Sequence, residues 1–206
     1  MANLHFKYGS MGSSKTANAL MTRFNYMEKG LNVLLMKPAT DVRDDEIDEH
    51  GSRITKIRSR IGLEAVADII STEDNVVDLF RAHQKVKKVD VIIVDECQFL
   101  QPEQVDQLQY ICEFLDVPVL CFGLRTDFQS KLFPGSKRLF ELAYSVQEIE
   151  HICTCGRKSV INARFDEHGK IITEGAQVDI GGNEKYEAMC WTCWMKLKTN
   201  LKAFDF

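Results

Sequence analysis

The chain has 206 residues, of which 45% are hydrophobic and 27% charged, the balance of an ordinary globular protein. This length suffices for one well-cored domain of about 150 residues and a small appendage. A formal net charge of −4 argues against non-specific binding to nucleic acid or to an acidic membrane surface. No apolar run approaches the roughly 20 residues that span a bilayer, and residues 1–7 lack the layout of a secretory signal. We therefore predict a cytoplasmic protein whose seven cysteines are thiols or metal ligands rather than disulfides.

In chain order, apolar segments alternate with amphipathic ones. Residues 2–8 are predicted to form a strand that runs into a glycine-containing loop, and residues 15–29 a helix. Further strands are expected at 31–36, 89–94 and 117–122, and further helices at 74–86 and 102–115. The stretch 41–60 is highly charged, which predicts a mobile loop or lid. The alternation continues to about residue 145 and is typical of a parallel sheet with helices on both faces.

After residue 145 the sequence changes to cysteines, glycines and short alternating segments. Residues 161–165 and 170–173 flank a turn at 167–169 and predict a hairpin, and a helix is expected from about Tyr186. We therefore predict two domains, a larger one at 1–148 and a small one at 149–206.

The first predicted strand runs directly into the segment Gly9-Ser10-Met11-Gly12-Ser13-Ser14-Lys15-Thr16. A phosphate-binding loop has the pattern G-x-x-x-x-G-K-[ST], and here Ser14 stands where the second glycine is expected. In such a loop backbone N–H groups bind phosphate, Lys15 reaches the outer phosphates and the Thr16 hydroxyl binds Mg²⁺. A serine held at positive φ costs on the order of 1–2 kcal/mol. The plainer alternative is an ordinary strand-to-helix turn.

A pair of acidic residues, Asp95 and Glu96, follows the predicted strand at 89–94. Ligands of open parallel sheets bind at the carboxyl ends of the strands. Asp95 fits the metal-side acid that accompanies a phosphate loop, and Glu96 is expected to point to the opposite side and to accept a proton. The alternative is a pair of solvated acids, which the presence of Lys15 and Thr16 upstream disfavours.

Two close pairs of cysteines are separated by an insert of hairpin size: Cys153, Cys155, Cys190 and Cys193. This arrangement suits a closed, structural four-thiolate zinc site in a domain too small for its own core. The first pair is C-x-C, which is tighter than the common C-x-x-C. Two histidines are alternative ligands: His151 and His168. The other cysteines lie in apolar segments and are predicted to be core residues: Cys97, Cys112 and Cys121.

With these three features in this order, the chain resembles the zinc-bearing, cytosolic-type (type II) thymidine kinases, in particular bacterial members. The resemblance extends from about Phe6 to Cys193 and rests on the ordered segments 9–16, 41–43, 95–99, 123–128 and 180–186. It implies an α/β, P-loop (RecA-like) parallel sheet flanked by helices, with a small zinc-stapled lasso domain. The kinase domain would then be 1–148, and the nucleoside-binding lasso domain with its C-terminal helix 149–206.

The resemblance also implies the reaction, which is transfer of the γ-phosphate of ATP to the 5′-hydroxyl of thymidine and of deoxyuridine. Glu96 would be the general base, and Arg43 would stabilise charge on the transferring phosphoryl group. ATP and Mg²⁺ would be held by the 9–16 loop and by Asp41, Asp95, Glu96, Cys97 and Gln98. Phe128 would stack on thymine, and the other nucleoside-binding residues would be Leu124, Phe133, Gln177, Val178, Asp179, Ile180, Gly181 and Tyr186. Members are typically homotetramers inhibited by thymidine triphosphate, with no nucleic-acid or membrane partner.

Two other functions compete with this one. Residues 95–98 also resemble a helicase box, which would make the chain a helicase- or recombinase-like ATPase with a structural zinc site. The short chain, its acidic balance and the absence of a second motor domain argue against that. A zinc module that binds nucleic acid through Trp191 and Trp194 would need a basic surface that the composition does not supply.

Overall fold

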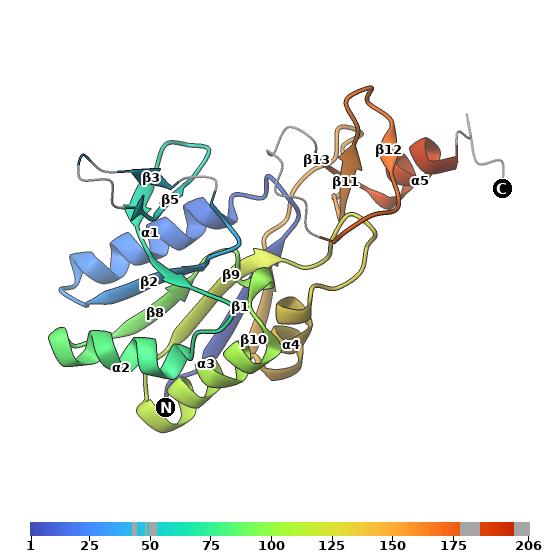
Figure 1. Ribbon diagram of the computed structural model, residues 1–206. Helices are drawn as coiled ribbons and strands as arrows, with labels where there is room; N and C mark the ends of the chain where they lie inside the picture. Colours follow the sequence, from blue (N-terminus) through green and yellow to red (C-terminus); the bar gives the residue numbers. More distant parts are fainter. Residues whose placement is uncertain (43–44, 48, 50–52, 178–185, 200–206) are drawn as a thin grey trace.

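The computed structural model describes residues 1–42, 45–47, 49, 53–177 and 186–199 (Figure 1). Its centre is a six-stranded sheet in the order β10-β1-β9-β8-β2-β7, in which every neighbouring pair is parallel. The strands are β1 (Leu4–Gly9), β2 (Val33–Pro38), β7 (Asp68–Ile70), β8 (Val91–Val94), β9 (Val119–Leu124) and β10 (Ser145–Glu148). The predicted parallel sheet is confirmed.

Helices cover both faces of this sheet: α1 (Lys15–Glu28) lies on one, and α2 (Val76–Val86), α3 (Pro102–Leu115) and α4 (Pro134–Leu142) lie on the other (Figure 1). Strand β8 shows why the central strands are apolar throughout. Its Ile92 and Val94 pack on the side of α2 and α3, whereas Val91 and Ile93 pack on the side of α1. A strand buried on both faces has no polar positions to alternate with. Within the described part of the chain, no helix is both long and apolar enough to cross a membrane.

The stretch 41–60, predicted to be a mobile loop or lid, is not an irregular loop in the part that the structure describes, because it contains short antiparallel hairpins. Strand β3 (Glu46–Ile47) pairs with β4 (Arg53–Ile54), and β5 (Lys56–Arg58) pairs with β6 (Glu64–Val66). Lys37, only 1% exposed, anchors this region to the sheet. Its Nζ lies 2.9 Å from Asp45 Oδ1 and donates to the Lys56 carbonyl over 2.8 Å. Strands of two or three residues are too short to show the alternation that predicts a strand.

A small antiparallel sheet projects beyond the carboxyl edge of the large one (Figure 1). It consists of β12 (Ile171–Ile172), β11 (Ile161–Phe165) and β13 (Tyr186–Met189), and α5 (Trp191–Thr199) follows. The hairpin predicted here is confirmed, but the helix predicted from Tyr186 is wrong. Tyr186 pairs with Arg164 in the sheet, and the helix begins only at Trp191. We call residues 149–177 and 186–199 the small subdomain.

The central strand provides a test of the core. Ile92 is fully buried, so Ile92→Ala is expected to lower the free energy of unfolding by about 2–5 kcal/mol, because a cavity forms as well as apolar contact being lost. Val86→Ala is the matched control, since Val86 is 90% exposed and its loss should change stability by no more than about 0.5 kcal/mol. Urea unfolding measures both changes. Equal unfolding midpoints for the two variants would contradict this packing.

Candidate active site

A cleft of about 420 Å³ lies at the carboxyl edge of the parallel sheet, where open α/β sheets bind their ligands. It is lined by residues that follow three strands of the sheet: Lys15 after β1, Asp95 after β8 and Thr126 after β9. The small subdomain supplies Asn162 and Tyr186 to the same lining. The cleft therefore lies where the large sheet and the small subdomain meet.

The segment 9–16 forms a loop that ends at the start of α1. Ser14 has φ 61° and ψ 27°, which confirms the left-handed conformation expected where the usual motif has glycine. Lys15 is 7% exposed, and its Nζ donates to the Ser10 carbonyl over 2.8 Å within the loop. The predicted loop residues that line the cleft are Met11, Gly12, Ser14, Lys15 and Thr16.

Three other predicted residues of this loop do not line the cleft: Gly9, Ser10 and Ser13. Gly9 illustrates how closely the chain packs there. A Cβ at this position would lie 2.3 Å from Ser13 Oγ and 2.5 Å from the Ile149 carbonyl. Glycine is therefore required at position 9 by space, because any side chain would push the loop away from the small subdomain.

Both members of the acidic pair, Asp95 and Glu96, line the cleft. Strand β8 ends at Val94, and Glu96 has a positive φ of 50°, so strand alternation does not continue through these residues. Burial raises the pKa of Asp95 to about 7, and the neighbouring Glu96 charge adds to this, while a hydrogen bond from Thr16 opposes it.

The residues present at this point fit a magnesium ion. Asp95 is 2% exposed, and its Oδ1 has no hydrogen-bond partner among the described residues. A buried carboxylate oxygen without a partner is costly, and a bound cation removes that cost. The Thr16 hydroxyl, which is hydrogen-bonded to Asp95, supplies a second oxygen of the hard type that Mg²⁺ prefers.

Gln98 holds Glu96 in place beside the cleft. Its Nε2 donates to Glu96 Oε2 over 2.5 Å, and its Oε1 accepts the Leu124 N–H over 2.9 Å. Cys97 turns the other way, into the main core, where it is fully buried and burial raises the pKa of its thiol. Cys112 and Cys121 lie in the same core, as predicted. Asp41 is buried and lines the cleft.

The cleft also has an aromatic and apolar wall. Phe128 and Phe133 are 1% and 4% exposed and line it together with Leu124, Tyr186 and Gln177, all of which are predicted nucleoside-binding residues. Gln177 Nε2 donates to Asp127 Oδ2 over 2.9 Å. The remaining predicted residues lie outside the described residues: Arg43, Val178, Asp179, Ile180 and Gly181.

Several lining residues were missed by the sequence analysis. Arg58, at the end of β5, and Arg60, in the turn between β5 and β6, line the cleft, although this charged stretch was interpreted as a loop or lid. Phe99 lines the cleft and packs edge-on against Phe133, with ring centroids 5.7 Å apart. The density of arginines in 53–60 was an available signal for a phosphate site. Asn162 gave no signal at all, because its role depends on contacts distant in sequence.

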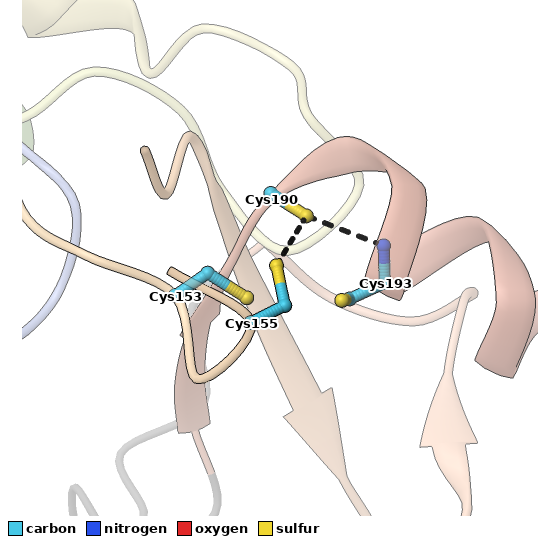
Figure 2. A group of neighbouring side chains, drawn as sticks. All are labelled: Cys153, Cys155, Cys190 and Cys193. Carbon is cyan, nitrogen blue, oxygen red and sulfur yellow. Dashed lines mark hydrogen bonds between the residues drawn. The ribbon is translucent and has the colours of Figure 1, made fainter. Parts of the chain in front are cut away.

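The four predicted cysteines come together in the small subdomain (Figure 2). Their sulfur atoms all lie within 4.8 Å of one another, and Cys155 Sγ is 3.6 Å from Cys190 Sγ. A tetrahedral zinc site with Zn–S bonds of about 2.3 Å requires sulfur atoms about 3.8 Å apart, so the donor set and its size fit zinc. The tight C-x-C spacing is no obstacle, and neither His151 nor His168 belongs to the group among the described residues.

The thiols of this group differ in how readily they ionise: hydrogen bonds with Cys155 and Cys190 raise the pKa of Cys193 to about 12, whereas Cys153 is already favoured as a thiolate. Burial opposes ionisation of Cys153, but hydrogen bonds from the backbone at Cys155 and Cys190 outweigh it and lower the pKa of the thiol to about 6. A thiolate is the form of cysteine that ligates zinc.

A parallel sheet with a phosphate loop after its first strand and an acid after a central strand defines the class of P-loop nucleotide-binding proteins. Within that class, residues 2–194 match the family model described as "Thymidine kinase". The chain is 44% identical over 190 residues to a thymidine kinase of Shewanella oneidensis, covering 92% of this chain and 95% of the relative. It is 45% identical over 194 residues to a thymidine kinase of Ruegeria pomeroyi, covering 94% of each chain. The chain belongs to the thymidine kinase family.

A solved structure of the Pif1 helicase from Candida albicans matches 72% of this chain and 36% of that chain, with 14% identity and a TM-score of 0.39. This likeness is too weak to bear on function.

The cysteine group predicts how the chain binds metal. We expect purified wild-type protein to hold about one zinc per chain and Cys155→Ser to lose most of it, because a four-thiolate site needs all its ligands. Cys112→Ala is the control, since Cys112 lies in the other core and its loss leaves the site intact. Metal analysis by mass spectrometry gives the ratio. Full zinc content in Cys155→Ser would show that the group is not the ligand set.

Proposed function

We propose that this member of the thymidine kinase family transfers the γ-phosphate of ATP to the 5′-hydroxyl of thymidine, and of deoxyuridine, in deoxynucleotide salvage. The observation that carries this proposal is the sharing of one cleft by phosphate-type and base-type residues. Lys15, Thr16, Asp95 and Glu96 line this cleft, and so do Phe128 and the aromatic wall around it. Family membership supports a thymidine kinase enzyme and the use of ATP.

Phosphoryl transfer depends mainly on positioning and on stabilising the charge of the transferred group. In this proposal the backbone N–H groups of the loop and Lys15 bind the phosphates of ATP. Thr16 and Asp95 hold Mg²⁺, which when bound neutralises charge on the phosphate oxygens. Glu96, oriented by Gln98, accepts the proton of the nucleoside 5′-hydroxyl as that oxygen attacks.

The nucleoside is proposed to occupy the cleft beside this aromatic wall. Phe128, 1% exposed and held beneath Arg164 at 5.3 Å, provides a rigid face against which a thymine ring stacks. Leu124 and Phe133 close the sides of this pocket. Gln177, Tyr186 and residues 178–181 are proposed to bind the base and sugar, as the family resemblance implies.

The remaining expectations extend this proposal. Zinc is assigned a structural role in the small subdomain, and the domains are assigned to 1–148 and 149–206. We also propose a homotetramer in the cytoplasm that is inhibited by thymidine triphosphate and has no nucleic-acid or membrane partner.

One mutant tests the assignment of the base. Glu96→Gln should preserve the fold and ATP binding but lower kcat by at least about 10²-fold, because the amide cannot accept the proton. Turnover is measured with ATP, Mg²⁺ and a panel of nucleosides, and ATP binding by calorimetry. The matched control is Glu113→Gln on the exposed part of α3, which should turn over like wild type. Near-wild-type kcat in Glu96→Gln would refute the mechanism, as would ATP turnover stimulated by DNA rather than by a nucleoside.

The cation for the transferring phosphoryl group is proposed to come from the 41–60 segment. Arg43 is suggested by the family resemblance, and Arg60 by its place in the lining of the cleft. We expect Arg60→Ala to lower kcat by about 10³-fold while the KM for thymidine changes little, as for other arginines that stabilise a transferring phosphoryl group. The same kinetic measurements on Arg43→Ala test whether Arg43 also stabilises the transferring phosphoryl group. Normal kcat in Arg60→Ala would remove this residue from the mechanism.

A further inference from the structure

The phosphate loop is held on one side by the small subdomain. The Met11 N–H donates to Asn162 Oδ1 over 2.8 Å, and Asn162 Nδ2 donates to the Thr126 carbonyl over 2.8 Å. Asn162 is 4% exposed and lies on β11. One buried amide therefore joins the loop after β1, the turn after β9 and the small subdomain. Its two ends have different partners, which fixes both its position and its orientation.

A second buried contact runs beside the first. Ser10 Oγ lies 3.1 Å from Ser159 Oγ, and Ser159 Oγ also donates to the His151 carbonyl over 2.9 Å. Ser10 is 8% exposed and Ser159 2% exposed, so water does not compete freely for these groups. Since Gly9 meets the Ile149 carbonyl at close range, the front half of the phosphate loop rests on the small subdomain along its length.

Strand β11, which carries Asn162, is connected to the cysteine group in two ways, through the chain that precedes it and through its partner strand β13. Asn162 pairs with Ala188 on β13, and Cys190 follows that strand directly. Cys153 and Cys155 precede β11, so zinc held by the group would join the start of β11 to the end of β13 (Figure 2). The same small core contains Cys153, Cys190 and Ile161, the neighbour of Asn162. The position of Asn162 therefore depends on the integrity of the metal group.

We propose that Asn162 is a positioning residue through which the zinc-clamped strand β11 sets the phosphate loop, so that zinc binding and nucleotide binding strengthen each other. The Met11 N–H is held by Asn162, which fixes the Ser10–Met11 peptide at the start of the loop. Loss of the clamp frees β11 and with it the loop. Because the coupling between two binding free energies is reciprocal, bound nucleotide must in turn raise the affinity for zinc. We expect this gain in affinity to lie in slower release of zinc. This inference rests on the proposed role of residues 9–16 in binding ATP.

The test follows zinc release from the zinc-loaded enzyme into excess pyridylazoresorcinol, with and without MgATP. In the wild type, MgATP should slow release by at least about fivefold, the lower end of typical coupling between sites. In Asn162→Ala the two rates should coincide, and the KM for ATP should rise more than the KM for thymidine. Ile161→Ala is the matched control, because it weakens the same small core without touching the loop. It should release zinc faster overall but keep the MgATP effect.

Each outcome decides the matter. Equal slowing by MgATP in Asn162→Ala and wild type overturns the proposal, and so does loss of the effect in Ile161→Ala, which would assign it to subdomain stability. A rise in the KM for thymidine alone would place Asn162 in the nucleoside pocket instead. If Asn162→Ala does not fold, Ser159→Ala removes the second contact and should reduce the MgATP effect. The proposed function fails separately, if the wild type neither binds ATP nor phosphorylates a nucleoside.

Discussion

The parallel register of β1, β9 and β8 is the constraint on which the rest of the site depends. Leu4 to Gly9 pair with Val119 to Leu124, and Ile92 to Val94 pair with Val119 to Cys121, so all three strands end at one edge. Three segments therefore meet at this edge simply because their strands end there: the loop with Lys15, the acids after β8 and the turn that leads to Phe128. The apolar strands hold this arrangement because each is buried on both faces.

The small subdomain supplies the rest of the cleft at this edge of the sheet. Its own core contains few residues, which is a reason for a metal to stabilise it. It supplies Asn162 and Tyr186 to the cleft and packs against the phosphate loop. The left-handed Ser14 fits this account, because a loop held by the sheet on one side and by Asn162 on the other can tolerate a strained serine.

The sequence analysis predicted the parts of the site that are local in sequence. The loop at 9–16, the acids at 95–96 and the cysteine pairs each carry their chemistry in their spacing, and the structure brings them into the expected places. Tyr186 was assigned to a helix because pairing with β11, which decides its conformation, has no local signature. Asn162 was missed for the same reason, whereas Arg60 had a local signal, the arginines of 53–60, that the sequence analysis did not use. The expected direction of Glu96 assumed strand alternation, but β8 ends two residues before it, at Val94.

The central claim is that Glu96 and the phosphate loop act on the 5′-hydroxyl of a nucleoside bound against the aromatic wall. The most direct measurement compares two substrates that each keep one hydroxyl, 3′-deoxythymidine and 5′-deoxythymidine, with ATP and Mg²⁺ and with products identified by mass spectrometry. The account predicts a monophosphate from 3′-deoxythymidine and none from 5′-deoxythymidine. Phosphorylation of 5′-deoxythymidine would contradict the account. So would a result in which neither analogue reacts and thymidine is phosphorylated at its 3′-hydroxyl.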